Sequence, residues 1–261
     1  MHVISETTPA DGVVERHFTL GAVSGVLWAP GRDLGDVPLV LLGHGGGQDK
    51  LAPGVVGRAL RFVADCGFAV VAIDAPGHGG RERTEEDERL IAALRERVVA
   101  GLPAEEQVNR FHTALAARAV PEWRATLDAV RGEAGVGGPV GYWGLSMGCA
   151  IGVPLVAAEP RIAAAVLGLA GSQPPSGEEN LAAIAARISV PVEFLLQWDD
   201  SMVPRDSALA LFEALGSREK TLHANPGGHM EVPAHELDSA ERFFTRHLTG
   251  GGTRVSQYVE S

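Results

Sequence analysis

Short apolar runs alternate with longer amphipathic segments from about residue 38 onward. Most of the short runs are continuously apolar, which is typical of strands buried on both faces of a parallel sheet. The predicted strands are Val13–Leu20, Ala22–Ala29, Leu39–Leu42, Phe68–Ile73, Val140–Trp143, Ala163–Leu169, Val192–Leu196 and, as a weaker candidate near the far edge, Glu219–His223. The alternation predicts an α/β fold whose mostly parallel sheet carries helices on both faces.

The segments between these strands repeat apolar residues at steps of three and four, which predicts helices. Pro154 should make the helix after the third of the buried runs irregular in its first turns. The apolar stripes are Val55/Ala59/Phe62/Val63, Trp123/Leu127/Val130, Val153/Leu155/Val156, Ala208/Leu211/Phe212/Leu215 and Leu237/Ala240/Phe243/Phe244/Leu248.

Residues 81–119 interrupt the alternation. They open with a charged run, Arg81 to Glu88, and continue with two amphipathic patterns, Leu90/Leu94/Val98 and Val108/Phe111/Leu115. We expect an inserted pair of helices before the helix at Trp123, which either covers the site as a lid or is a solvated surface excursion. The glycine-rich end, residues 250–261, is expected to be a flexible tail. With no internal repeat or linker, residues 1–261 are expected to form a single domain.

Composition narrows the classes of function. The chain has 261 residues, 45% of them hydrophobic, which suits a globular protein with a sizeable core. A formal net charge of −11 disfavours binding to nucleic acid or to an anionic membrane surface. No apolar stretch approaches 18 residues, and the first twelve do not resemble a signal peptide. Cys66 and Cys149 are expected to be reduced, mostly buried thiols, so we expect a cytoplasmic protein.

The five residues Gly144-Leu145-Ser146-Met147-Gly148 lie between a predicted strand and a predicted helix. This spacing is typical of a nucleophile elbow, a tight turn that holds a serine hydroxyl above the end of a sheet. With 33 glycines in the chain, a chance match has a probability on the order of one fifth, so the surrounding sequence must supply support.

A serine nucleophile needs a base, and the base needs an orienting acid, in the chain order serine, acid, histidine. Asp200 follows the strand Val192–Leu196 and precedes a helix, so we predict it as the acid, with its neighbour Asp199 as the alternative. His229 ends a glycine-rich loop after the last strand, so we predict it as the base. His223 and His235 are expected to be structural or solvent-facing.

Two backbone N–H groups should hold the developing oxyanion. One belongs to Met147, the residue after the nucleophile. The N-terminus of the following helix carries a partial positive charge, which strengthens the binding of an anion at this N–H. The other should come from the loop Gly43–Gly47, with Gly46 as our choice and Gly47 as the alternative. His44 is expected to pin this loop, and the turn Asp74–Gly80 to be structural. No metal-binding, dinucleotide or phosphate-loop motif is present, so we predict no cofactor and no metal.

These motifs together resemble the α/β-hydrolase superfamily. The supporting segments, in family order, are His44–Gly47, Asp74–Gly79, Gly144–Gly148, Asp200–Pro204 and Gly228–His229. Within the superfamily the chain is similar to small bacterial esterases of the dienelactone-hydrolase-like group. Dienelactone hydrolases proper use a cysteine nucleophile, whereas this chain has Ser146.

The resemblance implies one α/β-hydrolase domain with an eight-stranded, mostly parallel sheet. It implies a serine hydrolase that cleaves small to medium carboxylic esters through an acyl-enzyme intermediate, with the catalytic triad Ser146, Asp200 and His229. A thioesterase, amide hydrolase or C–C bond hydrolase could use the same triad, and a non-catalytic ligand sensor is the alternative from another class. The expected partner is a small-molecule ester; the natural substrate and the oligomeric state are left open.

Overall fold

The computed structural model describes residues 1–172 and 180–250. The predicted tail beyond Gly250, and part of the loop that follows Ser172, lie outside these ranges. The strands are β1 His2–Ala10, β2 Val13–Leu20, β3 Val23–Pro30, β4 Leu39–Leu42, β5 Ala69–Ile73, β6 Val140–Leu145, β7 Ile162–Gly168, β8 Val192–Gln197 and β9 Lys220–Asn225. The helices are α1 Pro53–Cys66, α2 Glu85–Val99, α3 Glu105–Glu133, α4 Met147–Ala158, α5 Leu181–Ala185, α6 Arg205–Ala214 and α7 His235–Leu248.

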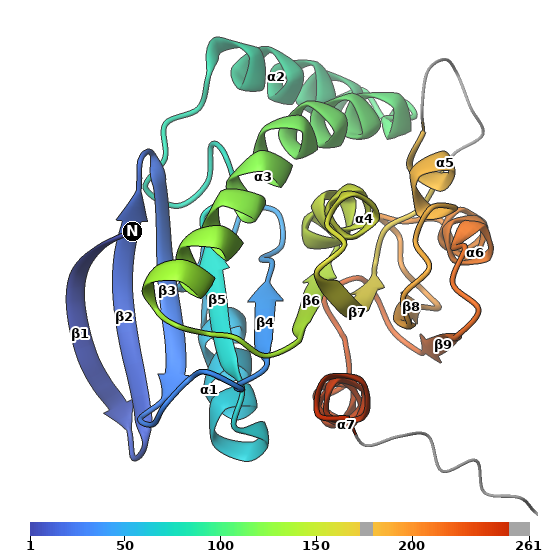
Figure 1. Cartoon of the computed structure of the whole chain (residues 1–261). Helices are drawn as coiled ribbons and strands as arrows, with labels where there is room; N and C mark the ends of the chain where they lie inside the picture. Colours follow the sequence, from blue (N-terminus) through green and yellow to red (C-terminus); the bar gives the residue numbers. More distant parts are fainter. Residues whose placement is uncertain (173–179, 251–261) are drawn as a thin grey trace, which may run out of the picture.

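All the strands join one sheet, in the order β1-β2-β3-β5-β4-β6-β7-β8-β9 (Figure 1). The strands from β5 to β9 in this order run parallel to one another, while β1, β2 and β3 are antiparallel at one edge. The predicted α/β class with a mostly parallel sheet is therefore confirmed. Parallel strands direct their carboxyl ends to one edge, where the loops after β4, β6, β8 and β9 meet.

The strand count was wrong by one, because the described part of the chain forms nine strands rather than eight. The extra strand, β1, is exposed along its whole length, so burial imposes no apolar alternation on it. A sequence signal was nevertheless available. Asp11-Gly12 joins β1 to β2 with Ala10 opposite Val13, and Gly12 has a φ of 74°. Such a two-residue turn is a strong hairpin signal.

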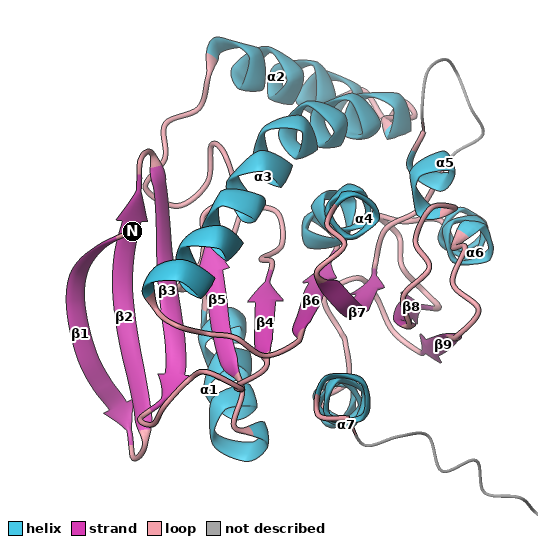
Figure 2. Cartoon of the chain, in the orientation of Figure 1, coloured by secondary structure: helices cyan, strands magenta, loops and turns pink. Residues whose placement is uncertain are grey.

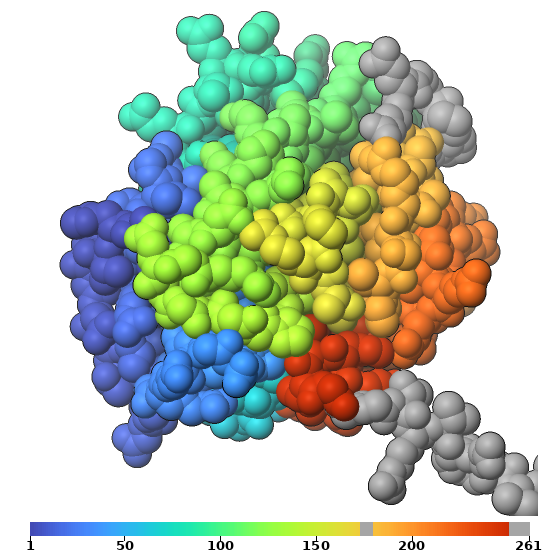
Figure 3. Space-filling view, viewed as in Figure 1, coloured from blue at the N-terminus to red at the C-terminus, as the bar shows by residue number. Residues whose placement is uncertain are grey.

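Helices cover both faces of the sheet (Figure 2), and each face has its own apolar core. On one side α1 and α7 pack together, where Phe62 and Phe244 meet edge to face at 5.7 Å between ring centroids. On the other side α3, α4 and α6 pack, where Trp123 meets Tyr142 edge to face at 6.2 Å. In the space-filling view, α3 and α4 form a continuous green-to-yellow layer over this face (Figure 3).

Helix α3 corrects one prediction. The second helix of the insertion and the helix at Trp123 are a single element, Glu105–Glu133, with Pro121 inside it. Proline lacks an N–H and normally breaks a helix interior. Here Pro121 lies on the exposed side, while the stripe on the opposite side from Leu115 to Val130 is buried against the sheet. Packing of that stripe stabilises the helix through the proline.

The two cysteines and the helix lengths bear on two further expectations from the sequence. Cys66 is half-buried and Cys149 is buried, and both thiols are free. Of the helices in the described residues, none is both long and apolar enough to cross a membrane.

Candidate active site

Ser146 occupies a strained turn between β6 and α4. Its φ of 56° and ψ of −121° lie in a region that residues with a side chain rarely adopt. A Cβ on Gly144 would lie 2.6 Å from the carbonyl oxygen of Gly148, and a Cβ on Gly148 would lie 3.2 Å from the carbonyl oxygen of His44. The Tyr142 hydroxyl donates to the Gly148 carbonyl at 2.6 Å. The two glycines thus allow the close approach that the predicted elbow requires.

The imidazole of His229 lies between Ser146 and Asp200. Its Nε2 is 2.9 Å from Ser146 Oγ and its Nδ1 is 2.6 Å from Asp200 Oδ2. His229 is 9% exposed, so water competes little for these hydrogen bonds. The other Asp200 oxygen accepts from the backbone N–H groups of Met202 at 2.8 Å and Val203 at 3.0 Å. Asp200 is thereby held with one oxygen toward the imidazole.

Asp199, the alternative acid, takes a different position. Its carboxylate accepts from Gly227 N at 3.2 Å, and its own N–H donates to Gly227 O at 3.1 Å. Asp199 therefore contacts the backbone of the loop that carries His229, whereas Asp200 contacts the imidazole itself.

The loop Pro226–His229 is held by side chains that the motifs did not reveal. Gln197, the last residue of β8, donates from Nε2 to the carbonyls of Gly228 at 3.2 Å and Pro226 at 3.4 Å. Glu231 accepts from Gly228 N at 2.7 Å. Gln197 is a polar residue that directly follows the apolar run Phe194–Leu196 of β8, and that break in the pattern was the signal available in the sequence.

The two predicted oxyanion donors lie side by side. Met147 is the first residue of α4, so its N–H belongs to the first turn, which has no partner within the helix. A Cβ built on Gly46 would lie 3.9 Å from Met147 Cβ, which places the Gly43–Gly47 loop directly across from the elbow. Gly45 N donates to Gln48 Oε1 at 3.2 Å and closes this loop. The oxyanion roles themselves stay predictions.

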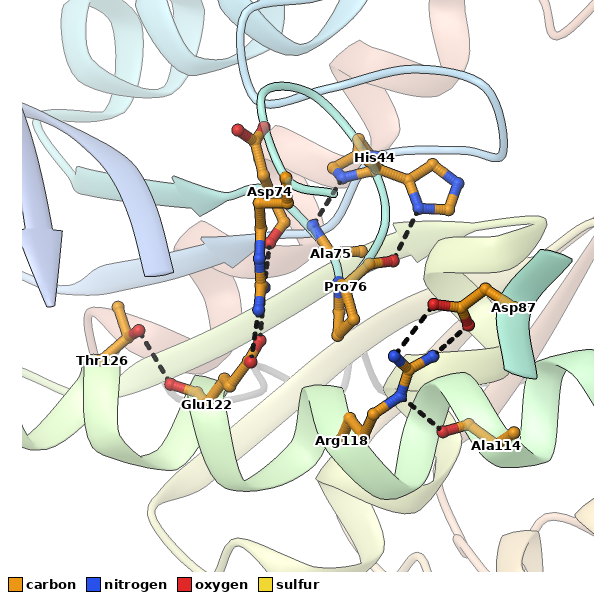
Figure 4. A network of polar contacts seen from close by, with 11 residues as sticks. His44, Asp74, Ala75, Pro76, Asp87, Ala114, Arg118, Glu122 and Thr126 are labelled. Atoms are coloured by element: carbon orange, nitrogen blue, oxygen red, sulfur yellow. Dashed lines mark hydrogen bonds and ion pairs between the residues drawn. The ribbon is translucent and has the colours of Figure 1, made fainter. Parts of the chain in front are cut away.

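His44 holds two loops together (Figure 4). Its Nε2 accepts from Ala75 N at 3.0 Å, which leaves the proton on Nδ1, and Nδ1 donates to Gly45 O at 2.9 Å. Burial lowers the pKa of His44, so the neutral ring that this pattern requires is favoured. These contacts agree with the expectation that His44 pins this loop.

The turn after β5 is also structural, as predicted. Asp74 is fully buried and accepts from the Lys50 backbone N–H at 3.0 Å and from Lys50 Nζ at 2.6 Å. A Cβ on Gly79, whose φ is 59°, would lie 2.4 Å from the Asp74 carboxylate carbon. Asp74 is therefore engaged in anchoring the loop after β4, and not in a second acid–base pair.

Two ion pairs tie the start of the inserted segment, residues 81–87, to α3 (Figure 4). Arg81 contacts Glu122 with two hydrogen bonds of 2.7 Å, and Arg118 donates to both oxygens of Asp87. Asp87 also completes the capping box that begins α2 at Thr84. These contacts fix where α2 begins; whether the segment covers bound substrate stays a prediction.

Cys149 lies in the same helix as the elbow, one turn after Ser146. Burial raises the pKa of its thiol to about 12, so it stays neutral at ordinary pH. The thiolate is the nucleophilic form, so the structure favours Ser146 over Cys149 as the nucleophile of this site.

Nearly the whole chain is similar in sequence and fold to solved structures of esterases. No protein-family model and none of the curated proteins matches the chain. Among solved structures, a polyethylene-glycol-bound cold-adapted esterase from an Arctic intertidal metagenomic library is 35% identical, with a TM-score of 0.71 over 94% of this chain and 98% of that chain. A zinc-bound structure of a cold-adapted esterase from such a library is 32% identical, with a TM-score of 0.69 over 95% and 100% of the two chains. A dienelactone hydrolase from Anabaena variabilis is 18% identical, with a TM-score of 0.62 over 91% and 99%, and shares the fold.

Proposed function

Because the chain belongs to the α/β-hydrolase superfamily and is similar to its esterases, we propose that it is a carboxylesterase-type serine hydrolase. The observation that carries the proposal is the hydrogen-bonded row Asp200–His229–Ser146, with distances of 2.6 and 2.9 Å. A hydroxyl is a weak nucleophile until a base removes its proton, and this row supplies the base and its orienting acid.

In the proposed reaction, His229 Nε2 takes the Ser146 proton while Ser146 Oγ attacks the ester carbonyl carbon. Asp200 accepts the Nδ1–H bond of His229 and stabilises the imidazolium that forms. The N–H groups of Met147 and Gly46 donate to the carbonyl oxygen as it becomes an oxyanion. Collapse of the tetrahedral intermediate breaks the bond to the alcohol oxygen, which leaves with the proton from His229.

In the second half of the reaction, water is the nucleophile and His229 again acts first as base and then as acid. His229 takes a proton from water, the resulting hydroxide adds to the acyl carbon, and the Ser146 ester bond breaks as His229 returns the proton to Oγ. One ester and one water give one carboxylic acid and one alcohol. The row of contacts supports the same geometry for both halves, because a single imidazole reaches the serine and the acid.

The proposal is tested with nitrophenyl esters of increasing acyl chain length. Wild type should hydrolyse them, and Ser146→Ala should lose roughly 10⁶-fold in kcat, because only the oxyanion hole and substrate binding remain. Ser189→Ala is the matched control, since Ser189 is exposed and precedes β8, at the opposite end of that strand from Asp200. Activity that survives in Ser146→Ala, or that is lost equally in Ser189→Ala, would contradict the proposal. Thioesters and amides of the acyl group that reacts best then define the bond preference.

A further inference from the structure

A second cluster of chemically active side chains lies at the base of the loop that carries His229. It consists of Glu193 on β8, His223 on β9 and Glu236 in the first turn of α7. One nitrogen or oxygen atom from each residue lies within 4.8 Å of the others. Both carboxylates are buried, at 3% exposure for Glu193 and 5% for Glu236, while His223 is half-buried.

The contacts within the cluster leave one buried oxygen without a partner. His223 Nδ1 is 2.7 Å from Glu236 Oε2, and His223 Nε2 is 3.8 Å from Glu193 Oε2. Asn225 donates to Glu236 Oε1 and Ser239 donates to Glu193 Oε2. Glu193 Oε1 is buried and has no hydrogen-bond partner among the described residues. A buried carboxylate oxygen without a hydrogen-bond partner destabilises the folded state unless a water, an ion or another ligand binds it.

The charge of the cluster is also unbalanced. Two buried carboxylates share one half-buried imidazole. Arg242 is a further cation that is close enough to interact with Glu193. A bound cation would satisfy the Glu193 oxygen and offset the negative charge at once.

We propose that Glu193, His223 and Glu236 bind a divalent transition-metal ion, for which Zn²⁺ best fits the donors. One imidazole with two carboxylates is a set of nitrogen and oxygen ligands that Zn²⁺ accepts, with bonds of about 2.0–2.2 Å. Ligand atoms around such an ion lie roughly 3–3.5 Å apart in a tetrahedron. The most widely separated ligand atoms, up to 4.8 Å apart, therefore need to close by roughly 1.3–1.8 Å, and His223 must turn one nitrogen away from its present hydrogen bond.

The surroundings allow that adjustment. The His223 side chain is 28% exposed, which gives it room to rotate and gives the ion a route from solvent. His235 Nε2 is 3.7 Å from Glu236 Oε1, and its side chain is 68% exposed, so it can swing in as a fourth ligand or leave that position to water. The ion would then join β8 to β9 and α7, and the last two are the elements that the His229 loop connects. Its role is structural and adds no step to the proposed reaction.

Calorimetric titration of the full-length, chelator-treated protein with Zn²⁺ tests the site. We expect one high-affinity ion per chain, a higher Tm with zinc, and binding at least tenfold weaker in His223→Asn and in Glu193→Gln. His17→Asn is the matched control, because His17 and Glu15 form a histidine–carboxylate pair at 2.8 Å elsewhere in the chain, and its affinity should equal that of wild type. Unchanged affinity in both cluster variants would overturn the proposal.

A second measurement does not depend on the variants folding. Crystals of the wild type soaked in Zn²⁺, recorded at the zinc absorption edge, should show an anomalous peak between Glu193, His223 and Glu236. Peaks only at the site of His229 and Asp200, or only at surface histidines, would overturn the proposal while leaving the esterase proposal intact.

Discussion

Gln197 Nε2 lies 3.2 Å from the carbonyl oxygen of Gly228, the residue immediately before His229. The last side chain of β8 thus holds the backbone of the loop after β9. Asp200 follows Gln197 by three residues, so the acid and the support for the base leave the sheet from the same strand end. The distance between Asp200 and His229 is therefore set by the end of β8, which carries Asp200 and also holds the backbone next to His229.

Gln197 is a positioning residue, and removing its donor should lower kcat without changing KM much. Gln197→Met removes the amide, and Gln197→Glu keeps its volume but cannot donate when ionised. We expect each variant to lose about tenfold in kcat, the loss that about 1.4 kcal/mol of hydrogen bonding explains. Steady-state kinetics and the rate of fluorophosphonate labelling should fall together. A lower Tm with unchanged kcat would reduce Gln197 to a purely structural role.

Asp200→Asn should be far more damaging than Asp199→Asn. An asparagine at position 200 would disturb the tautomer that directs His229 Nε2 at Ser146, so kcat should fall by roughly 10³-fold to 10⁴-fold with KM within a few-fold. Asp199 contacts only the Gly227 backbone in this loop, so its variant should lose less than about tenfold. Kinetics on one nitrophenyl ester compare the two directly. A larger loss in Asp199→Asn would mean that the acid is misassigned.

The elbow glycine can be tested against a matched glycine elsewhere. Gly144→Ala places a Cβ 2.6 Å from the Gly148 carbonyl oxygen. We therefore expect the free energy of unfolding to fall by about 3 kcal/mol, or the protein not to fold at all. Gly57 lies inside α1 with open space around it, so Gly57→Ala should stabilise by about 0.5–1 kcal/mol. Thermal unfolding of both variants measures the difference. Equal Tm values would show that the elbow tolerates a side chain.

Glu159 provides a pH-dependent test of stability. Hydrogen bonds from Arg161 lower the pKa of this buried carboxyl from 4.5 to about 2. A depressed pKa in the folded state means that the stabilisation is present above pH 4.5 and is lost as the pH falls toward 2. Arg161 and Arg124 are partly exposed, so solvent screens their attraction to Glu159. Glu159→Gln should therefore lower the free energy of unfolding by only about 2 kcal/mol at pH 7. Urea unfolding at pH 7, 5 and 3 should show this cost shrinking; a cost independent of pH would contradict it.

The features that sequence predicted best are those that local chemistry dictates. Continuous apolar runs predicted β4 to β7 because a strand buried on both faces tolerates little else. The elbow around Ser146, and the loop positions of Asp200 and His229, followed from turn chemistry and chain order. The structure brings these three side chains together at one edge of the sheet.

The features that sequence missed depend on tertiary context. β1 carries no burial pattern because it is exposed, and only its Asp11-Gly12 turn marks it. Helix α3 continues past Pro121 because packing of its buried face outweighs the lost hydrogen bond. The supports from Gln197 and Glu231, and the cluster around His223, join residues whose pairing no local pattern shows.

Covalent labelling with a fluorophosphonate, followed by peptide mass spectrometry, tests the proposed nucleophile and its base most directly. We predict one adduct per chain, on Ser146, that forms at least about 10²-fold more slowly in His229→Ala, because the imidazole activates the hydroxyl. An adduct on another residue, or labelling of Ser146 at the same rate without His229, would contradict this prediction.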